Sequence, residues 1–241
     1  MKFGWLAAAL LLFGAASAAA QSTTTAQNSA GRKMLGIHVQ DEWKAVGRLN
    51  FGRGFCSAAL IAPDLVATAA HCLFVKRTGA QVGAERIHFV AGYRMRKFAG
   101  HEKAANVAIH PDYVFSTSPR RSDVASDLAL VRLKAPMAEI RPFLMSRSLE
   151  AGDEVAIVSY GRDRPEIASI QSPCGVLSRS GSIAVLDCDA TYGVSGAPVL
   201  RFEGGEWQVA GVVSAMAQRD GRKVVLAVVL PEEVGAVLGA R

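Results

Sequence analysis

Short apolar segments recur along the chain, and clusters of turn-forming residues separate them. Each segment is about four to eight residues long, which is the length of a β-strand rather than that of a helix. The first set comprises residues 45–49, 57–61, 65–70, 87–92, 106–109 and 128–133. The second set comprises residues 154–160, 174–177, 182–188, 198–202, 207–214 and 223–230. Two sets of about six strands predict an all-β chain with two packed, six-stranded antiparallel β-barrels.

The two predicted barrels meet between Pro136 and Pro142, where prolines bracket a charged stretch and interrupt strand pairing. We therefore expect an N-terminal β-barrel at residues 37–138 and a C-terminal β-barrel at residues 139–241. Only the tail from Pro231 onward predicts a helix. A proline there precedes acidic residues that would lie near the positive end of the helix dipole.

Residues 1–20 follow the three-part pattern of a secretory signal peptide. Lys2 precedes an apolar run at residues 3–15, and small residues follow it. A membrane anchor is the alternative, but a spanning helix needs about 20 apolar residues. Residues 21–36 are mostly polar and predict a flexible leader. We expect a secreted or periplasmic protein with no integral membrane segment after signal removal.

Composition and charge narrow the classes of function. The chain of 241 residues is 50% hydrophobic and 20% charged, so it can bury a large core and is not a disordered protein. A formal net charge of +6 raises nucleic acid or an anionic surface as a partner. Lys and Arg are scattered, however, and no basic motif interleaved with aromatic residues is present. We expect a basic solvated surface and no nucleic-acid partner.

The four cysteines fit an exported protein, because oxidising compartments allow disulfides to persist. They allow three connectivities. Proximity in sequence favours Cys56 with Cys72 and Cys174 with Cys188, and each bridge would stabilise the fold by about 3 kcal/mol in the chain-entropy model. Zinc is the alternative, but the chain has no Cys-x-x-Cys pair. We expect no metal and no cofactor.

His71 is the first candidate catalytic residue. It follows the small residues Ala69 and Ala70, which let the backbone pack tightly beneath an imidazole, and it precedes Cys72. A disulfide from Cys72 to Cys56 would fix the direction of the ring, as a general base requires. A structural histidine is the alternative on this segment alone.

Asp127 is the second candidate, because it stands just before the apolar strand at residues 128–133. An acid in that position tends to be partly buried and must find a hydrogen-bond partner. A histidine suits it, since a carboxylate bonded to Nδ1–H fixes the tautomer. An acid that only caps the start of the strand is equally compatible with this segment.

Ser195 is the third candidate, and it is held between Gly193-Val194 and Gly196 ahead of a predicted strand. The glycines permit a tight turn that exposes the hydroxyl. They would also direct the amides of Gly193 and Ser195 at one point, where a carbonyl oxygen could become negative. A plain glycine-rich turn is the alternative. The Gly-x-Ser-x-Gly elbow is not matched, because Ala197 stands two residues after Ser195.

These three segments, in the order His, Asp, Ser, resemble the catalytic boxes of the chymotrypsin/trypsin family. The matching residues are Thr68-Ala69-Ala70-His71-Cys72, Asp127-Leu128-Ala129-Leu130 and Gly193-Val194-Ser195-Gly196-Ala197-Pro198. The similarity extends from about Trp43 to Leu230. It implies two barrels with the triad in the crevice between them, and it implies that Ser214 supports the aspartate from behind.

Val194, which precedes the candidate nucleophile, departs from the animal trypsins, where an aspartate captures a newly freed N-terminal ammonium. A valine cannot do that, so we expect that catalytic activity does not depend on an ion pair with a new N-terminal amine. Arg32-Lys33 nevertheless faintly resembles an activation site. Other segments, among them Asp187-Cys188-Asp189-Ala190-Thr191, are more similar to the bacterial branch that contains the glutamyl endopeptidases.

Asp189 is the candidate that would set specificity, because trypsin-like members place the acid that binds Arg or Lys six residues before the nucleophile. Two features oppose this role: Met216 stands where a small residue would keep the pocket open, and Asp189 adjoins Cys188. Small or medium apolar residues before the scissile bond are the alternative. Acidic residues are a third, but no histidine follows Ser195 to bind them.

The resemblance implies an exported serine endopeptidase that cleaves peptide bonds through an acyl-enzyme. Its triad would be His71, Asp127 and Ser195, its oxyanion donors Gly193 and Ser195, and its preference Arg or Lys before the scissile bond. Protein or peptide substrates are the expected partners, and a monomer is the expected state. A catalytically silent scaffold used for binding is the alternative.

Overall fold

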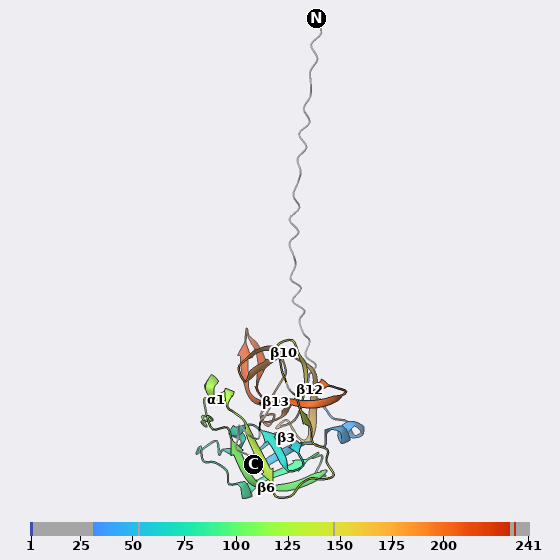
Figure 1. Ribbon diagram of the computed structural model, residues 1–241, viewed down its shortest axis with the longest axis vertical. Helices are drawn as coiled ribbons and strands as arrows, with labels where there is room; N and C mark the ends of the chain where they lie inside the picture. The colour runs from blue at the N-terminus through green and yellow to red at the C-terminus, as the bar shows by residue number, and fades with distance from the viewer. Residues whose placement is uncertain (2–30, 53, 147, 232–233, 235–241) are drawn as a thin grey trace.

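The computed structural model describes residues 1, 31–52, 54–146, 148–231 and 234. This part of the chain folds mostly as antiparallel strands in two halves, which lie one above the other in Figure 1. Most of the predicted signal peptide, part of the leader and most of the predicted C-terminal helix lie outside the described residues.

The lower half in Figure 1 is a closed barrel with the strand order β2-β3-β4-β7-β6-β5. Its strands are β2 (Val46–Phe51), β3 (Gly54–Ala62), β4 (Leu65–Thr68), β5 (Ile87–Ala91), β6 (Gly100–Ile109) and β7 (Ala129–Leu133). β5 pairs with β2 and closes the ring, so that Leu49 lies opposite Phe89. Both side chains are fully buried. Gly47 is needed beside them, because a Cβ there would overlap the Phe89 ring.

The upper half is a second ring of antiparallel strands, in which β9 pairs with both β10 and β12. Its strands are β9 (Glu154–Gly161), β10 (Arg164–Ser180), β11 (Ile183–Leu186), β12 (Pro198–Glu203), β13 (Glu206–Arg219) and β14 (Arg222–Val229). The short strand β8 (Leu144–Met145) adds to β13 in parallel. Valine, alanine and leucine side chains fill a separate core inside this ring. The described fold is therefore the predicted all-β pair of barrels.

Several strands extend beyond their predicted bounds, and the largest extensions are those of β6 and β10. β6 begins at Gly100 rather than at residue 106, because its first residues are mostly polar or small and give no apolar pattern. β10 runs from Arg164 to Ser180 rather than over residues 174–177, and it is continuous through Pro165 and Pro173. The pairing of β10 with β9 shifts register near both prolines, and such irregularities accommodate residues that cannot donate to the ladder.

The expectation that only the tail is helical was wrong. The chain contains an α-helix, α1 (Arg121–Ala125), and the 3-10 helices η1 (Ile37–Trp43), η2 (Ala70–Leu73) and η3 (Ala84–Arg86). These segments are too short to show a helical period in the sequence. At the start of α1, the Asp123 carboxylate accepts a hydrogen bond of 2.8 Å from the backbone N–H of Arg120. This N–H at the N-terminus of the helix has no acceptor within the helix itself, so the carboxylate supplies one.

The leader is ordered before Gly36, contrary to the predicted flexible segment at residues 21–36. The strand β1 (Lys33–Met34) pairs with β10, and the N–H of Leu35 donates to the carbonyl of Ala168 at 2.8 Å. Leu35 is buried. The folded part therefore includes the end of the leader, which completes one edge of the second barrel.

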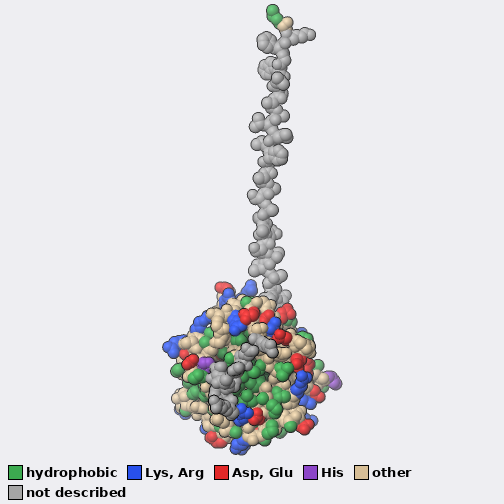
Figure 2. Space-filling view, viewed as in Figure 1, with side chains coloured by type: hydrophobic (Ala, Val, Ile, Leu, Met, Phe, Trp, Pro, Cys, Tyr) green, Lys and Arg blue, Asp and Glu red, His purple; other side chains and the backbone are tan. Residues whose placement is uncertain are grey.

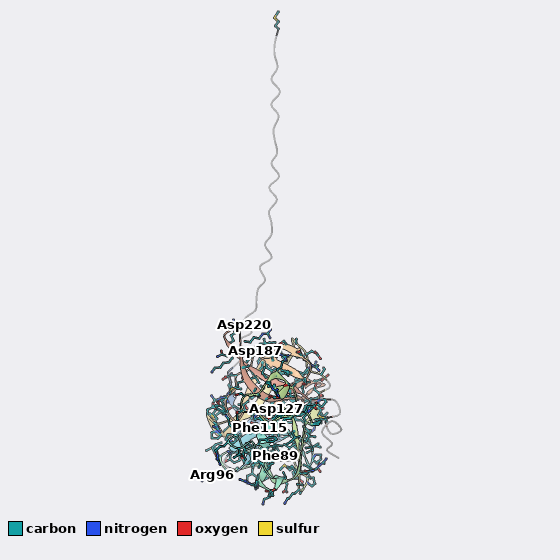
Figure 3. The ribbon with its side chains drawn as sticks, turned by 90° about the vertical axis from the view of Figure 1, so that its left-hand side faces the viewer. Phe89, Arg96, Phe115, Asp127, Asp187 and Asp220 are labelled. Atoms are coloured by element: carbon teal, nitrogen blue, oxygen red, sulfur yellow. A yellow bond between two sulfur atoms is a disulfide. The ribbon has the colours of Figure 1, made fainter. Side chains whose placement is uncertain are left out.

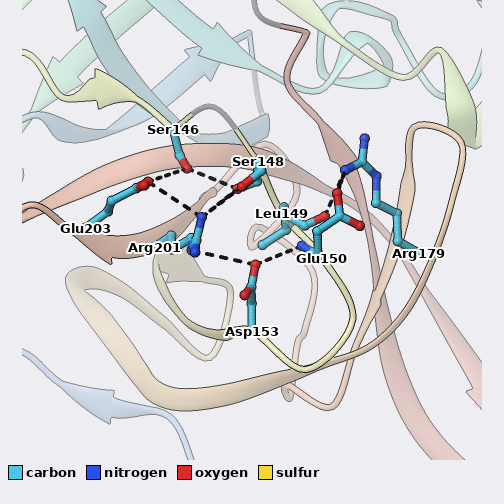
Figure 4. Close-up of polar contacts among 8 residues, drawn as sticks. All are labelled: Ser146, Ser148, Leu149, Glu150, Asp153, Arg179, Arg201 and Glu203. Carbon is cyan, nitrogen blue, oxygen red and sulfur yellow. Dashed lines mark hydrogen bonds and ion pairs between the residues drawn. The ribbon is translucent and has the colours of Figure 1, made fainter.

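A half-buried arginine fixes the chain where it enters the second barrel. Figure 4 shows the Arg201 guanidinium, from β12, between the Asp153 and Glu203 carboxylates and the Ser148 hydroxyl. Arg201 Nη1 donates to Ser148 Oγ at 2.9 Å, and each carboxylate lies 3.6 Å from the guanidinium. These contacts tie the segment that precedes β9 to a central strand.

The structure joins Cys56 to Cys72 and Cys174 to Cys188, so each barrel has one short disulfide-closed loop. On the face shown in Figure 2, Lys and Arg side chains are interspersed with Asp and Glu rather than gathered in one band. In the part of the chain that the structure describes, none of the helices has the length and apolar character needed to cross a membrane.

Candidate active site

The three candidate catalytic residues meet in one cleft of about 710 Å³. His71 lies in η2 of the first barrel, Asp127 lies between α1 and β7, and Ser195 lies in the turn before β12 of the second barrel. Figure 3 shows Asp127 at the level where the two halves meet, between Phe89 below and Asp187 above. The cleft therefore combines side chains from both barrels, as the resemblance to the chymotrypsin/trypsin family implies.

Asp127 is buried, and three donors satisfy its carboxylate. Oδ1 accepts from the backbone N–H of His71 at 2.8 Å. Oδ2 lies 2.7 Å from His71 Nδ1 and accepts from the Ser214 hydroxyl at 2.5 Å. A buried carboxylate needs partners of this kind, since leaving it unpaired would be costly. Asp127 therefore holds both the main chain and the ring of His71.

The contact with Asp127 decides which nitrogen of His71 carries the proton. An ionised carboxylate can only accept, so Nδ1 is the donor and Nε2 keeps its lone pair in the neutral ring. Burial disfavours the imidazolium, but the charge and hydrogen bond of Asp127 outweigh it and raise the pKa of His71 above its ordinary value; the Lys76 charge opposes that rise. His71 is therefore oriented and tuned as a proton acceptor.

Ser195 lies half-buried in a turn that contains two backbone amides without an acceptor among the described residues. Within the described residues, the N–H groups of Gly193 and Ser195 donate to no backbone or side-chain oxygen, whereas Val194 N–H donates to Thr191 and Gly196 N–H to Val213. The Ser195 hydroxyl has no hydrogen-bond partner in this part of the chain, and it opens into the cleft. Two unpaired amides beside a hydroxyl that lines the cleft can receive a developing oxyanion.

The turn can form only because Gly193 and Gly196 have positive φ angles, +95° and +76°. A Cβ on Gly196 would overlap Thr68 Oγ1 and the carbonyl oxygen of Ser57. A Cβ on Gly193 would lie 2.8 Å from the carbonyl oxygen of Tyr160. The two glycines therefore serve both backbone conformation and close approach to neighbouring strands.

The sequence interpretation missed Ser57, which anchors this turn. Ser57 is fully buried in β3, and its N–H donates to the Ser195 carbonyl at 2.9 Å. Its hydroxyl accepts from Tyr160 N–H at 2.8 Å and donates to the Gly193 carbonyl at 3.0 Å. A serine inside an apolar strand is the signal that could have identified it, because a fully buried hydroxyl needs partners.

Asp189 does not line the cleft, contrary to the predicted role in substrate binding. Its side chain is 56% exposed, and its carboxylate lies 3.9 Å from Nε of Arg32. Its N–H donates to the side chain of Gln171 at 2.8 Å, which holds the backbone of this loop. The acid is therefore part of an ion pair on the outside of the loop.

Arg32, at the end of the leader, is the second residue that the sequence interpretation missed. Its side chain is only 7% exposed and donates to Asp163 at 2.7 Å. The carbonyl of Arg32 accepts from Arg164 at 2.7 Å. Arg32 contacts both the turn at Asp163 and the loop at Asp189. It therefore links the loop that precedes Ser195 in the chain to the turn between β9 and β10, where Arg162 donates to the carbonyl of Tyr192.

Ala190, Val213 and Met216 line the cleft on the side of Ser214, where the sequence interpretation placed the specificity pocket. Val213 is buried, and Met216 is 48% exposed. Met216 lines the cleft together with Ala190, Val213 and Ala215, whose side chains are small or apolar. This part of the cleft therefore offers apolar surface to a substrate side chain.

Two groups of potential metal ligands occur within the described residues, around Cys56 and His71 and around Cys174 and Asp187. In each group the sulfur ligands are cysteines joined in a disulfide. A disulfide sulfur has no thiolate to offer, and zinc binds thiolate. Neither group therefore has the ligand chemistry of a metal centre.

Two comparisons with known proteins agree with this geometry. A family model described as Trypsin matches residues 38–231. A solved structure, "Structure of Glu endopeptidase in complex with MPD", superposes with a TM-score of 0.70 and 15% identity. The match covers 88% of this chain and 96% of that one, and at this identity it shows the fold alone.

We predict that Arg32→Gln loosens the segments beside Ser195, because Asp163 and Asp189 lose the cation between them. The expected result is faster hydrogen exchange at the amides of Arg162 and Val194, which are bonded to Tyr192 and Thr191. Mass spectrometry of peptides covering residues 160–164 and 189–194 measures it. Lys33→Gln, an exposed change of equal charge in β1, is the control. Equal exchange in both variants would contradict the role of Arg32.

Proposed function

The chain belongs to the trypsin family and is a serine endopeptidase, and we propose that His71, Asp127 and Ser195 form its catalytic triad. Ser195 Oγ would attack the scissile carbonyl and give an acyl-enzyme, which water then hydrolyses. Protein or peptide chains are the substrates. The contacts of Asp127 carry the proposal: a buried carboxylate orients the ring of His71 inside the cleft that Ser195 enters.

His71 performs the proton transfers in the proposed mechanism. Its Nε2, which has the free lone pair, takes the proton of the Ser195 hydroxyl as the new C–O bond forms. The same proton is then given to the leaving amine. Asp127 stabilises the imidazolium between these steps, and the Ser214 hydroxyl completes the solvation of that buried carboxylate.

The amides of Gly193 and Ser195 are proposed as the oxyanion donors. Neither has an acceptor among the described residues, so neither must break a bond when the substrate oxygen becomes negative. Donors held ready in this way avoid a cost of reorganisation during the reaction. Ser57 supports both by holding the carbonyls of Gly193 and Ser195 from behind.

We also propose that the enzyme is exported, to the periplasm or outside the cell. The pattern of residues 1–20 supports this, and so do the two disulfides, which persist in oxidising compartments.

Replacing Ser195 by Ala is expected to lower kcat for a peptide substrate by roughly 10⁴ to 10⁶, because the nucleophile is lost. A fluorophosphonate should label the wild type at Ser195, and intact-mass measurement detects the adduct. Ser118→Ala, at an exposed serine outside the cleft, is the control and should label normally. Near wild-type hydrolysis by Ser195→Ala, or no label on the wild type, would favour the silent scaffold instead.

The pKa of His71 predicts the acid limb of the pH profile. Only neutral His71 accepts a proton, so kcat/KM falls as pH drops through its pKa, and the raised pKa places the midpoint above 6.5. In Asp127→Asn the charge that raises the pKa is gone, so the midpoint should move to lower pH while kcat falls by about 10⁴. Initial rates of peptide hydrolysis measured across pH 5–9 give both the midpoint of the acid limb and kcat. A midpoint that Asp127→Asn leaves unchanged would contradict the pairing.

We propose that the side chain accepted before the scissile bond is small or medium and apolar. Ala190, Val213 and Met216 support this preference, since a well-packed apolar side chain gains free energy from burial. The position of Asp189 outside the cleft, beside Arg32, opposes a preference for Arg or Lys.

Peptides that differ only before the scissile bond test this preference. We expect kcat/KM to be higher for Val or Leu than for Arg or Lys, and Asp189→Ser to leave that order unchanged. Met216→Gly should improve cleavage after larger side chains, because it removes the half-exposed thioether from the cleft. A wild type that prefers Arg and Lys, together with an Asp189→Ser variant that does not, would contradict the apolar preference. It would show that Asp189 recognises the side chain before the scissile bond.

A further inference from the structure

We propose that the half of the cleft that receives the leaving group selects an acidic side chain in the first two substrate residues after the scissile bond. Lys76 and Arg162, which meet at the ring of Tyr192, would bind its carboxylate. This inference rests on the proposed function of Ser195 and concerns a different part of the substrate from the apolar preference above.

Tyr192 brings the two cations together. Its ring is 59% exposed in the cleft, directly before Gly193. Lys76 Nζ lies over the ring at 5.6 Å from its centroid, and Arg162 Cζ at 5.4 Å. Lys76 comes from the first barrel after η2, and Arg162 from the turn between β9 and β10 of the second. Side chains from both barrels therefore converge on the path of a substrate.

The cleft has an excess of unpaired positive charge. Within the described residues, its cations Lys76, Arg86 and Arg162 form no salt bridge. Its two acids are already engaged, Asp127 by His71 and Asp123 by Arg120. Charges of one sign along a cleft raise the local concentration of opposite charge. An acidic peptide therefore meets free cations there and no free carboxylate.

The position of His71 assigns these cations to the leaving-group half. His71 must reach the leaving amine, and Lys76 follows it by five residues, close enough for its charge to oppose the rise in the pKa of His71. Phe55 and the Cys56–Cys72 disulfide line the cleft with it. Val213 and Met216 flank Ser214, on the side assigned above to the acyl residue.

The two cations suit the carboxylate of an acidic side chain. Arg162 can offer two parallel N–H groups to one carboxylate, and Lys76 adds a point charge. The aromatic ring beneath them already replaces part of their water, so an incoming carboxylate displaces less solvent. A glutamine of equal size offers no charge and would lose this pairing.

The test uses internally quenched peptides with one common sequence before the scissile bond. Glu or Gln is placed at the first or second position after the bond, and a matched pair carries Glu or Gln two positions before it. With the variable residue after the bond, we expect kcat/KM for the Glu peptide to exceed that for the Gln peptide by about tenfold, which is the value of one favourable charge-assisted contact. With the variable residue before the bond, we expect the two peptides to differ little. Assays on the alkaline plateau keep His71 neutral in every variant.

Lys76→Gln and Arg162→Gln should each reduce the Glu-to-Gln ratio several-fold, and Arg162→Gln should leave kcat/KM for the Gln peptides nearly unchanged. Arg77→Gln, an exposed change of equal charge that lies outside the cleft lining, should keep the wild-type ratio. If Arg77→Gln lowers the ratio as much, or if Glu is favoured equally before the bond, the charge acts at long range and the proposed site is overturned.

Failure of this inference can be distinguished from failure of the proposed function. A wild type that is labelled by a fluorophosphonate at Ser195 and cleaves Glu and Gln peptides equally overturns the inference alone. A wild type that is neither labelled nor hydrolytic overturns the proposed function and the inference with it.

Discussion

The geometry of the cleft depends on the hydrogen bond between the N–H of Ser57 and the carbonyl of Ser195. Cys56 precedes Ser57 and is bonded to Cys72, which follows His71. One hydrogen bond, one disulfide and a few peptide bonds therefore connect the nucleophile in one barrel to the base in the other. Main-chain contacts of this kind leave little freedom for the two barrels to slide, and they keep the reacting groups together.

The charges of the cleft divide into a buried set and an exposed set with different roles. Asp127 is enclosed, fully bonded and unable to attract a substrate, so its effect is confined to His71. Lys76 and Arg162 are free to meet a ligand, and Lys76 also reaches His71 through its charge. An acidic ligand that neutralises Lys76 would thereby strengthen the basicity of His71. Substrate binding and proton transfer would be coupled through one side chain.

Much of this structure could be predicted, because its strands have a clear apolar pattern and its reacting residues stand in short, ordered segments. The apolar pattern located nearly all strands of both barrels, and the resemblance to the chymotrypsin/trypsin family implied that His71, Asp127, Ser195 and Ser214 lie together. It could not locate Asp189, since the partner that draws this acid outward, Arg32, is far away in the chain. Ser57 escaped notice for a similar reason: its partners belong to the other barrel.

The strand β1 has a consequence for maturation. Proteases that cut after basic residues need an accessible, extended main chain and a free basic side chain. The guanidinium of Arg32 is enclosed, and the next residue, Lys33, is paired with Ile170 of β10. The Arg32–Lys33 bond is thus hidden once the domain has folded. Cleavage after Arg32 by such a protease would therefore require β1 to detach from β10 first, and a chain in which β1 stays paired keeps its basic dipeptide.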